Sequence, residues 1–181
     1  MLYDAAAKTE ERRGFLRKVT AWLGMVLGGA VTLPGLAFLA HPLRKDTVAG
    51  GKEPLDVGAS DAQVKPEQPL MVDVRGELRD AWTRTPDVKL GACWLVREKP
   101  GAPVRAYSTI CPHLGCGVDY VPEKKQFLCP CHDSYFDLQG NVLTGPSPRG
   151  MDELDVQQGD NGRLKVAYRR FRLGTSKKVE V

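Results

Sequence analysis

The sequence lacks the features that identify several large classes of protein. Its net charge is only +4, and no basic run is interleaved with aromatic residues, so nucleic-acid binding finds no support. No internal repeat is visible. Histidine and cysteine are scarce, with three and five copies in 181 residues, yet six of these eight lie between positions 111 and 132. Such clustering is not expected of cysteines and histidines that only pack in a core, so it indicates where the functional site lies.

The longest run without a charged residue begins at Val19 and ends at Ala40. As a helix its 22 residues would span about 33 Å, which is enough for a bilayer core. The run exceeds the apolar region of a typical signal peptide, and no clear small-x-small cleavage site ends it. A retained anchor over residues 19–40 is therefore favoured over a cleaved signal. Four basic residues precede it and favour a cytoplasmic N-terminus: Arg12, Arg13, Arg17 and Lys18.

The six clustered residues form two groups, Cys111-Pro-His113-Leu-Gly-Cys116 and Cys129-Pro-Cys131-His132. Each group supplies one thiolate and one imidazole from its own loop. A 2Fe–2S cluster with two cysteines on one iron and two histidines on the other needs this ligand set, and its potential lies at about −150 to +300 mV. A histidine bound through one nitrogen keeps the other free to carry or release a proton. The pattern therefore suits the oxidation of a hydroquinone.

A structural zinc site with two cysteines and two histidines is the alternative. A zinc site of four ligands would give no role to Cys116 and Cys131. It would also leave the Gly145-Pro-Ser-Pro-Arg149 segment unexplained. The iron–sulfur interpretation is favoured for these reasons.

The residues after the anchor predict a tether and one β domain. Residues 41–52 contain His-Pro, Arg-Lys-Asp and Ala-Gly-Gly with little apolar periodicity, which is typical of a flexible tether. Short apolar runs separated by Pro-, Gly- and Asp-rich turns predict an all-β, antiparallel domain over residues 53–181. Residues 76–85 are ambiguous and compatible with a short helix. Strands are expected at residues 70–75, 92–98, 104–110, 126–129, 135–138 and 164–172.

The remaining cysteine and histidine are not interpreted as ligands. Cys93 lies in an apolar strand pattern, Gly-Ala-Cys-Trp-Leu-Val, and is expected to be a buried free thiol. His41 lies at the boundary of the anchor, far in sequence from the six, and is expected to be an interfacial residue.

The two ligand groups resemble those of the Rieske iron–sulfur proteins. The resemblance covers nearly the whole chain and is strongest to the Rieske subunit of quinol–cytochrome c reductases and their photosynthetic relatives. It implies a base β domain from about residues 53–107 and 149–181, with an inserted cluster-binding subdomain over about 108–148. It implies that one iron is bound by Cys111 and Cys129, the other iron by His113 and His132, and that a disulfide joins Cys116 and Cys131.

The resemblance also implies roles for the neighbours of the cluster. Leu114 and Gly115 would help to form the exposed tip near the histidines. Gly145 and Pro146 belong to a third loop that would shield another side.

The chain departs from the family after the last ligand. Members that use high-potential quinols usually have Gly-Ser-x-Tyr there, whereas His132 is followed here by Asp133-Ser134-Tyr135-Phe136. Ser134 falls where the family's serine donates a hydrogen bond to a bridging sulfide. Phe136 takes the place of the tyrosine that would donate to a ligand sulfur, and Tyr135 should point away by strand alternation. Fewer donors predict a lower potential, which favours menaquinol as the reductant.

The function implied by the resemblance is that of an oxidoreductase subunit. It would oxidise membrane quinol through the cluster, with His132 receiving the proton, and pass the electron to a c-type cytochrome. Its partners would be a cytochrome b-type membrane subunit and the cytochrome acceptor, in a multisubunit, dimeric complex. The implied disulfide argues for an oxidising compartment. We therefore expect a single-pass protein of the bacterial inner membrane with its C-terminal domain on the periplasmic, outer face.

Two related functions stay open as alternatives. One is the small Rieske subunit of a molybdenum oxidoreductase such as arsenite oxidase, against which the Gly-Pro-Ser-Pro loop and the long tether count. The other is a soluble ferredoxin-type carrier for a ring-hydroxylating dioxygenase, which lacks the extra cysteine pair and any anchor.

The N-terminal residues 1–18 also resemble a twin-arginine export signal. Arg12 and Arg13 are followed by Gly-Phe15-Leu16, although Glu11 stands where serine or threonine is usual. Such a signal suits a domain that receives its cluster in the cytoplasm and must cross the membrane folded. The alternative is that the arginines are only positive-inside charges.

Overall fold

The computed structural model describes residues 2–44, 48–49, 53–159 and 161–181. The chain forms two compact units, Met1–Asp46 and Thr47–Val181. The first consists of one long helix, α1 (Leu2–Ala40), and a short 3-10 helix, η1 (His41–Arg44). From Arg12 onward this helical segment is long and apolar enough to cross a membrane, and its most apolar stretch buries nothing within the protein. The apolar run expected at residues 19–40 thus lies within α1, a helix that also includes the basic residues before it.

The segment predicted to be a flexible tether, residues 41–52, includes η1 and strand β1 (Val48–Ala49). Its other residues, 45–47 and 50–52, lie outside the described part of the chain. The flexibility of this segment stays a prediction.

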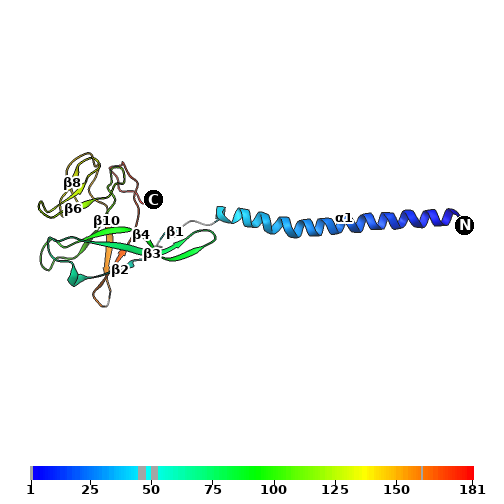
Figure 1. Cartoon of the computed structure of the whole chain (residues 1–181), viewed down its shortest axis with the longest axis horizontal. Coiled ribbons are helices and arrows are strands. Elements are labelled where there is room, and N and C mark those ends of the chain that lie inside the picture. Colours follow the sequence, from blue (N-terminus) through cyan, green and yellow to red (C-terminus); the bar gives the residue numbers. More distant parts are fainter. Residues whose placement is uncertain (1, 45–47, 50–52, 160) are drawn as a thin grey trace. The chain divides into compact units, whose positions relative to one another are not determined.

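Seven antiparallel strands form the larger sheet of the second unit, in the order β1-β3-β4-β5-β10-β11-β2 (Figure 1). Alternating burial places one face of these strands on an apolar core that includes Val74, Leu95 and Val166, each fully buried. The strands other than β1 are β2 (Leu55–Ser60), β3 (Leu70–Arg79), β4 (Arg84–Val96), β5 (Arg105–Ser108), β10 (Glu153–Gln158) and β11 (Arg163–Ala167).

Strands β3 and β4 form one long hairpin, in which Leu78 pairs with Thr85 and Arg79 with Arg84. The expectation that residues 76–85 are compatible with a short helix is therefore wrong. The reason is local turn chemistry: the Asp80 carboxylate accepts hydrogen bonds from the backbone N–H groups of Trp82 and Thr83, at 2.7 and 2.6 Å. An aspartate that closes a turn in this way favours strand reversal over helix.

A second sheet is inserted between β5 and β10 and contains four short antiparallel strands, in the order β6-β7-β8-β9. These strands are β6 (Asp119–Val121), β7 (Gln126–Cys129), β8 (Ser134–Phe136) and β9 (Val142–Thr144). A second apolar cluster fills the space below them and includes Trp94, Tyr107, Phe127 and Phe136. Because Cys111 and Cys129 belong to this cluster, the core reaches the proposed ligands.

The all-β, antiparallel fold class behind an N-terminal apolar helix is confirmed. Five strands, β1, β2, β6, β9 and β10, were not among those expected from the sequence. The strand expected at residues 164–172 ends at Ala167, and the chain continues as an irregular C-terminal segment.

Candidate metal centre

The two ligand groups lie on loops that the neighbouring strands bring together. The first loop follows β5 and closes on itself, because Cys111 N–H donates to the Cys116 carbonyl at 2.8 Å and Gly115 N–H donates to the Cys111 carbonyl at 3.0 Å. Gly115 has a φ of +85°, a left-handed conformation that glycine adopts without strain. The second loop joins the end of β7, at Cys129, to the start of β8.

The two candidate thiol ligands are buried. Cys111 and Cys129 are 1% and 2% exposed and lie within the second apolar cluster. Burial raises the pKa of the Cys111 thiol to about 11, while the backbone N–H groups of His113 and Leu114 at its sulfur act in the opposite direction. Its side chain also forms a hydrogen bond with Cys129, so the two sulfurs are neighbours.

The two candidate imidazole ligands face each other at the surface. The ring centroids of His113 and His132 are 4.8 Å apart and the rings are nearly perpendicular, at 82°. His113 is half-buried and His132 is exposed. The site therefore has a buried sulfur side and an accessible nitrogen side.

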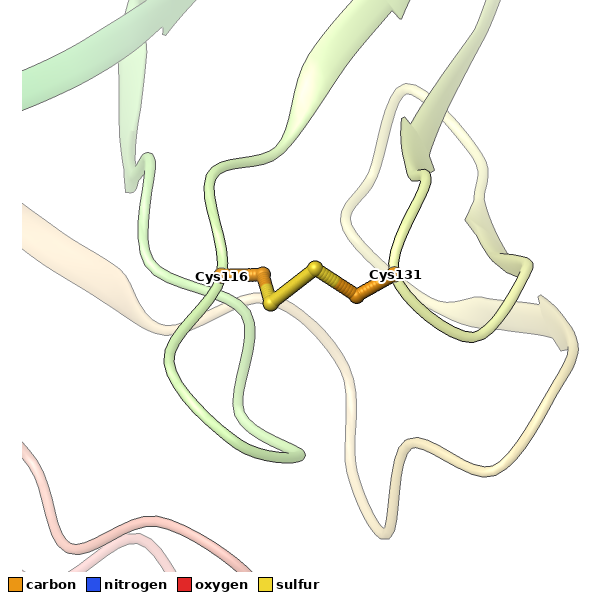
Figure 2. The surroundings of a disulfide bond; sticks show 2 residues. All are labelled: Cys116 and Cys131. Atoms are coloured by element: carbon orange, nitrogen blue, oxygen red, sulfur yellow. A yellow bond between two sulfur atoms is a disulfide. The ribbon is translucent and has the colours of Figure 1, made fainter.

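A disulfide between Cys116 and Cys131 joins the first loop to the second (Figure 2), the pairing implied by the resemblance. The two Cα atoms are 6.5 Å apart. The sulfurs of these residues also lie within 4.8 Å of the Cys129 sulfur, which by distance alone suggests a three-cysteine metal site. We give the disulfide more weight than this proximity, because two sulfurs that share a bond have no thiolate to offer a metal.

Ser134 tests whether these residues fit a 2Fe–2S cluster. Its side-chain oxygen is fully buried and has no hydrogen-bond partner within the described residues. A buried hydroxyl left in that state costs about 1–3 kcal/mol, so an acceptor is required. A cluster sulfide is such an acceptor. With two buried thiols and two adjacent imidazoles beside it, the site fits the cluster.

A third loop, which contains Gly145 and Pro146, packs on the second. Gly145 has a φ of +101°, and a Cβ atom there would lie 2.5 Å from Ser134 Cα and 2.6 Å from the Asp133 carbonyl oxygen. Only glycine permits this approach. Asp133 itself has a φ of +52°, so the aspartate adopts the left-handed conformation that a glycine would supply. Pro146 is exposed beside this contact.

The side chains of β8 alternate as expected. Ser134 and Phe136 point into the core and are fully buried, whereas Tyr135 is only partly buried and has the Lys124 ammonium 5.6 Å from its ring centroid. No tyrosine hydroxyl therefore takes the position of Phe136. At the tip of the first loop, Leu114 is 61% exposed.

Cys93 lies in β4 as a free thiol with no exposed surface. Burial raises its pKa to about 12. His41 lies in η1, in the other compact unit. Cys93 packs in the first apolar core, whereas the two candidate thiol ligands lie in the second.

Sequence analysis did not identify a buried ion pair beside the third loop. Arg149 and Asp152 are 9% and 5% exposed in their side chains and 2.8 Å apart. An arginine followed three residues later by an aspartate was the only sequence signal for this pair.

Comparison with known proteins gives the same assignment. The family model of the Rieske 2Fe–2S domain matches residues 57–159. The menaquinol:cytochrome c reductase iron–sulfur subunit of Geobacillus thermodenitrificans is 27% identical over 154 residues, which are 82% of this chain and 87% of that protein. The subunit of the same name from Bacillus subtilis is 29% identical over 140 residues, or 76% and 79% of the two chains.

Another relative is, by name, a subunit of a cytochrome b6-f complex. The cytochrome b6-f complex iron–sulfur subunit of Chlorobaculum thiosulfatiphilum is 27% identical over 152 residues, covering 83% of this chain and 73% of that one. Among solved structures, the plasma membrane Rieske protein of the cyanobacterium Synechocystis is 27% identical, with a TM-score of 0.40 over 51% of this chain and 87% of its own. Since the family model covers more than half of the chain, including both ligand groups, this protein is a member of the Rieske 2Fe–2S family and carries a 2Fe–2S cluster.

Proposed function

We propose that this chain is the electron-transfer subunit of a cytochrome bc-type complex, in which it oxidises membrane quinol and reduces a c-type cytochrome. The observation that carries the proposal is the polarity of the site. The two thiols are buried while His113 and His132 meet at the surface, where a quinol hydroxyl can reach them. The names of the relatives from Geobacillus and Bacillus support the same role.

In this proposal Cys111 and Cys129 hold one iron, and His113 and His132 hold the other. One-electron chemistry is what the 2Fe–2S cluster supplies when bound. The chain's own residues provide the proton chemistry: His132, exposed at the end of the second loop, accepts the proton that leaves the quinol hydroxyl. Leu114, exposed at the tip of the first loop beside His113, offers apolar surface to this contact.

The N-terminal helix supports a membrane location for this chemistry. We propose that α1 is a single-pass anchor of the bacterial inner membrane, with the β unit on the outer face and the tether allowing the head to visit a cytochrome b-type subunit and then the cytochrome acceptor. The apolar, unburied side chains of α1 and the basic residues before them support this orientation.

Menaquinol is the proposed reductant. Ser134 supplies one buried donor, and Phe136 supplies none. A reduced cluster with fewer donors around it is less stabilised, so its potential suits a low-potential quinol.

Purification of the full chain from its native membrane in mild detergent tests the proposal. We expect haem b and a cytochrome c-reducing activity that depends on menaquinol to co-purify with it. A preparation in which the chain accompanies a molybdenum protein, or no membrane cytochrome, would overturn the bc-type assignment.

A further inference from the structure

The last residues of the chain form a small hairpin beyond the strands of the large sheet. We call residues 170–181 the C-terminal hairpin. Arg172 N–H donates to the Val179 carbonyl at 2.8 Å and Val181 N–H donates to the Arg170 carbonyl at 3.0 Å. Phe171 and Glu180 form an isolated antiparallel bridge between them. The hairpin lies outside residues 57–159, which match the family model, so the family assignment gives it no role.

The tip of the C-terminal hairpin contacts the first cluster loop on both sides of His113. Before the histidine, the Pro112 carbonyl accepts a hydrogen bond from Gly174 N–H at 2.9 Å. After it, Leu173 packs so closely on Gly115 that a Cβ atom there would lie 2.8 Å from the Leu173 side chain. The backbone that carries the His113 ring is thus held at two points by one turn of the hairpin.

Arg149, at the end of the third loop, fastens the hairpin in this position. Its Nε and Nη2 atoms donate to both oxygens of Asp152, at 2.9 and 2.8 Å. The same guanidinium also donates to the Thr175 carbonyl at 2.5 Å and to the Arg172 carbonyl at 3.0 Å. A buried arginine that satisfies four acceptors with a rigid, planar fork holds them in one geometry, which a lysine cannot do.

We propose that the C-terminal hairpin positions His113 and that Arg149 is the residue that sets the hairpin. The proposal rests on the proposed role of His113 as an iron ligand. Among the hydrogen bonds of the described residues, none joins the first loop directly to the third. The two loops are connected only indirectly, through Arg149 and the tip of the hairpin. The hairpin therefore attaches the first loop at Pro112 and Gly115, in addition to the attachment that the disulfide makes at Cys116.

Hydrogen exchange and electron paramagnetic resonance (EPR) of the full-length protein in detergent test this positioning role. The informative variants are Leu173→Ala, Arg149→Gln and a chain that ends at Arg172. The control is Arg163→Gln, which breaks an arginine–aspartate fork of the same bidentate geometry but at the surface, to Asp56 at 2.6 and 2.9 Å, on strands remote from the loops in sequence.

In the three variants we expect the Gly115 and Cys111 amides to exchange about tenfold faster, as for the loss of one or two hydrogen bonds. Amides of the β4–β5 pairing should keep the wild-type rate, and the EPR signal of the reduced protein should broaden as the histidine geometry becomes heterogeneous. In the chain that ends at Arg172, Arg149→Gln should not accelerate exchange of the Gly115 and Cys111 amides further, because the Leu173 and Gly174 contacts with the first loop are already absent there. The control should match the wild type in every readout.

Unchanged Gly115 exchange and an unchanged EPR line in the shortened chain would overturn the proposal. So would an equal acceleration across β4 and β5, since this would show a loss of general stability. A wild-type protein without a Rieske-type signal would instead refute the ligand role of His113, while the exchange data would still report whether the hairpin holds the loop.

Discussion

Ser134 and Phe136 show how single residues adjust this site. They are the two inward-pointing side chains of β8, both fully buried, and only the serine has a hydrogen to donate. The Ser134 hydroxyl lacks a partner among the described protein atoms, and we propose that its acceptor is a sulfide of the bound cluster. The reduction potential should therefore respond to these two positions.

We expect Ser134→Ala to lower the reduction potential and Phe136→Tyr to raise it. A hydrogen bond to the cluster or a ligand sulfur is stronger when the cluster carries its extra electron. A difference of about 1 kcal/mol between the redox states corresponds to about 40 mV for a one-electron couple, so shifts of tens of millivolts are expected. Redox titration of both variants measures them. A wild type that titrates near +300 mV, or a Phe136→Tyr protein with an unchanged potential, would show the reasoning to be wrong.

Cys93 provides a second prediction for a single residue. Burial raises the pKa of its thiol to about 12, so the neutral thiol persists far above neutral pH and only a minute fraction is thiolate. We expect no alkylation of Cys93 by iodoacetamide at pH 8 in the folded protein and complete alkylation after denaturation. Mass spectrometry of the digested protein distinguishes the two states, and rapid labelling of the folded protein would contradict the burial.

The disulfide matters at the scale of loops, because it ties together two segments that the sheets hold only at their ends. Its two cysteines are separated by 15 positions in the sequence. Closing a loop of this size stabilises the folded state by about 3 kcal/mol in the chain-entropy model. Two of the proposed ligands, Cys129 and His132, lie next to the bridge in the sequence.

We expect Cys131→Ser to assemble the cluster but to lose it at a lower temperature than the wild type. All four proposed ligands remain, so the oxidised absorbance spectrum should be retained at low temperature. Thermal bleaching of that spectrum gives the comparison. Identical bleaching curves, or two free thiols at Cys116 and Cys131 in the oxidised wild type, would rule out a stabilising bridge.

At the scale of the whole molecule, the N-terminal arginines bear on two properties, the orientation of the anchor and the export of the folded domain. Arg12 and Arg13 lie a few residues before the uncharged run of α1 and supply positive charge to the end of the helix that we propose to be cytoplasmic. A domain folded around its cluster would also need an export route for folded proteins. The double substitution Arg12→Lys with Arg13→Lys keeps the charge and removes the arginine pair.

We expect this double variant to remain on the cytoplasmic side with its cluster assembled. Protease added to spheroplasts should then digest the β unit of the wild type but not that of the variant. Equal digestion of both would show that the arginines act only as positive charges.

The parts of the molecule that the sequence predicted are those whose information is local. The ligand pattern at residues 111–132, the apolar run at 19–40 and the alternation at Tyr135 each depend on residues close together in the chain. Strands β6 and β9 are each three residues long, which is too short for a periodic sequence pattern. The contacts of Arg149 with Arg172 and Thr175 join residues 23 and 26 positions apart, and no sequence spacing encodes such a meeting.

The ambiguity at residues 76–85 has a similar origin. The long β3–β4 hairpin is stabilised by cross-strand pairs such as Arg75 with Asp87, at 2.8 Å, and Lys89 with Asp73, at 2.7 Å. These pairs exist only once the register is set by the turn at Asp80. Local propensity alone could not distinguish this strand from a helix.

Iron and acid-labile sulfide analysis, with EPR of the reduced protein, tests the central claim most directly. The chain offers matched controls, since it has one further histidine and one further free cysteine. We expect His113→Ala, His132→Ala, Cys111→Ser and Cys129→Ser each to abolish the cluster, because one iron loses half of its protein ligands. The controls His41→Ala and Cys93→Ala should retain two iron atoms and two sulfides per chain, as expected for a 2Fe–2S protein. Full cluster occupancy in any of the four ligand variants would contradict the account.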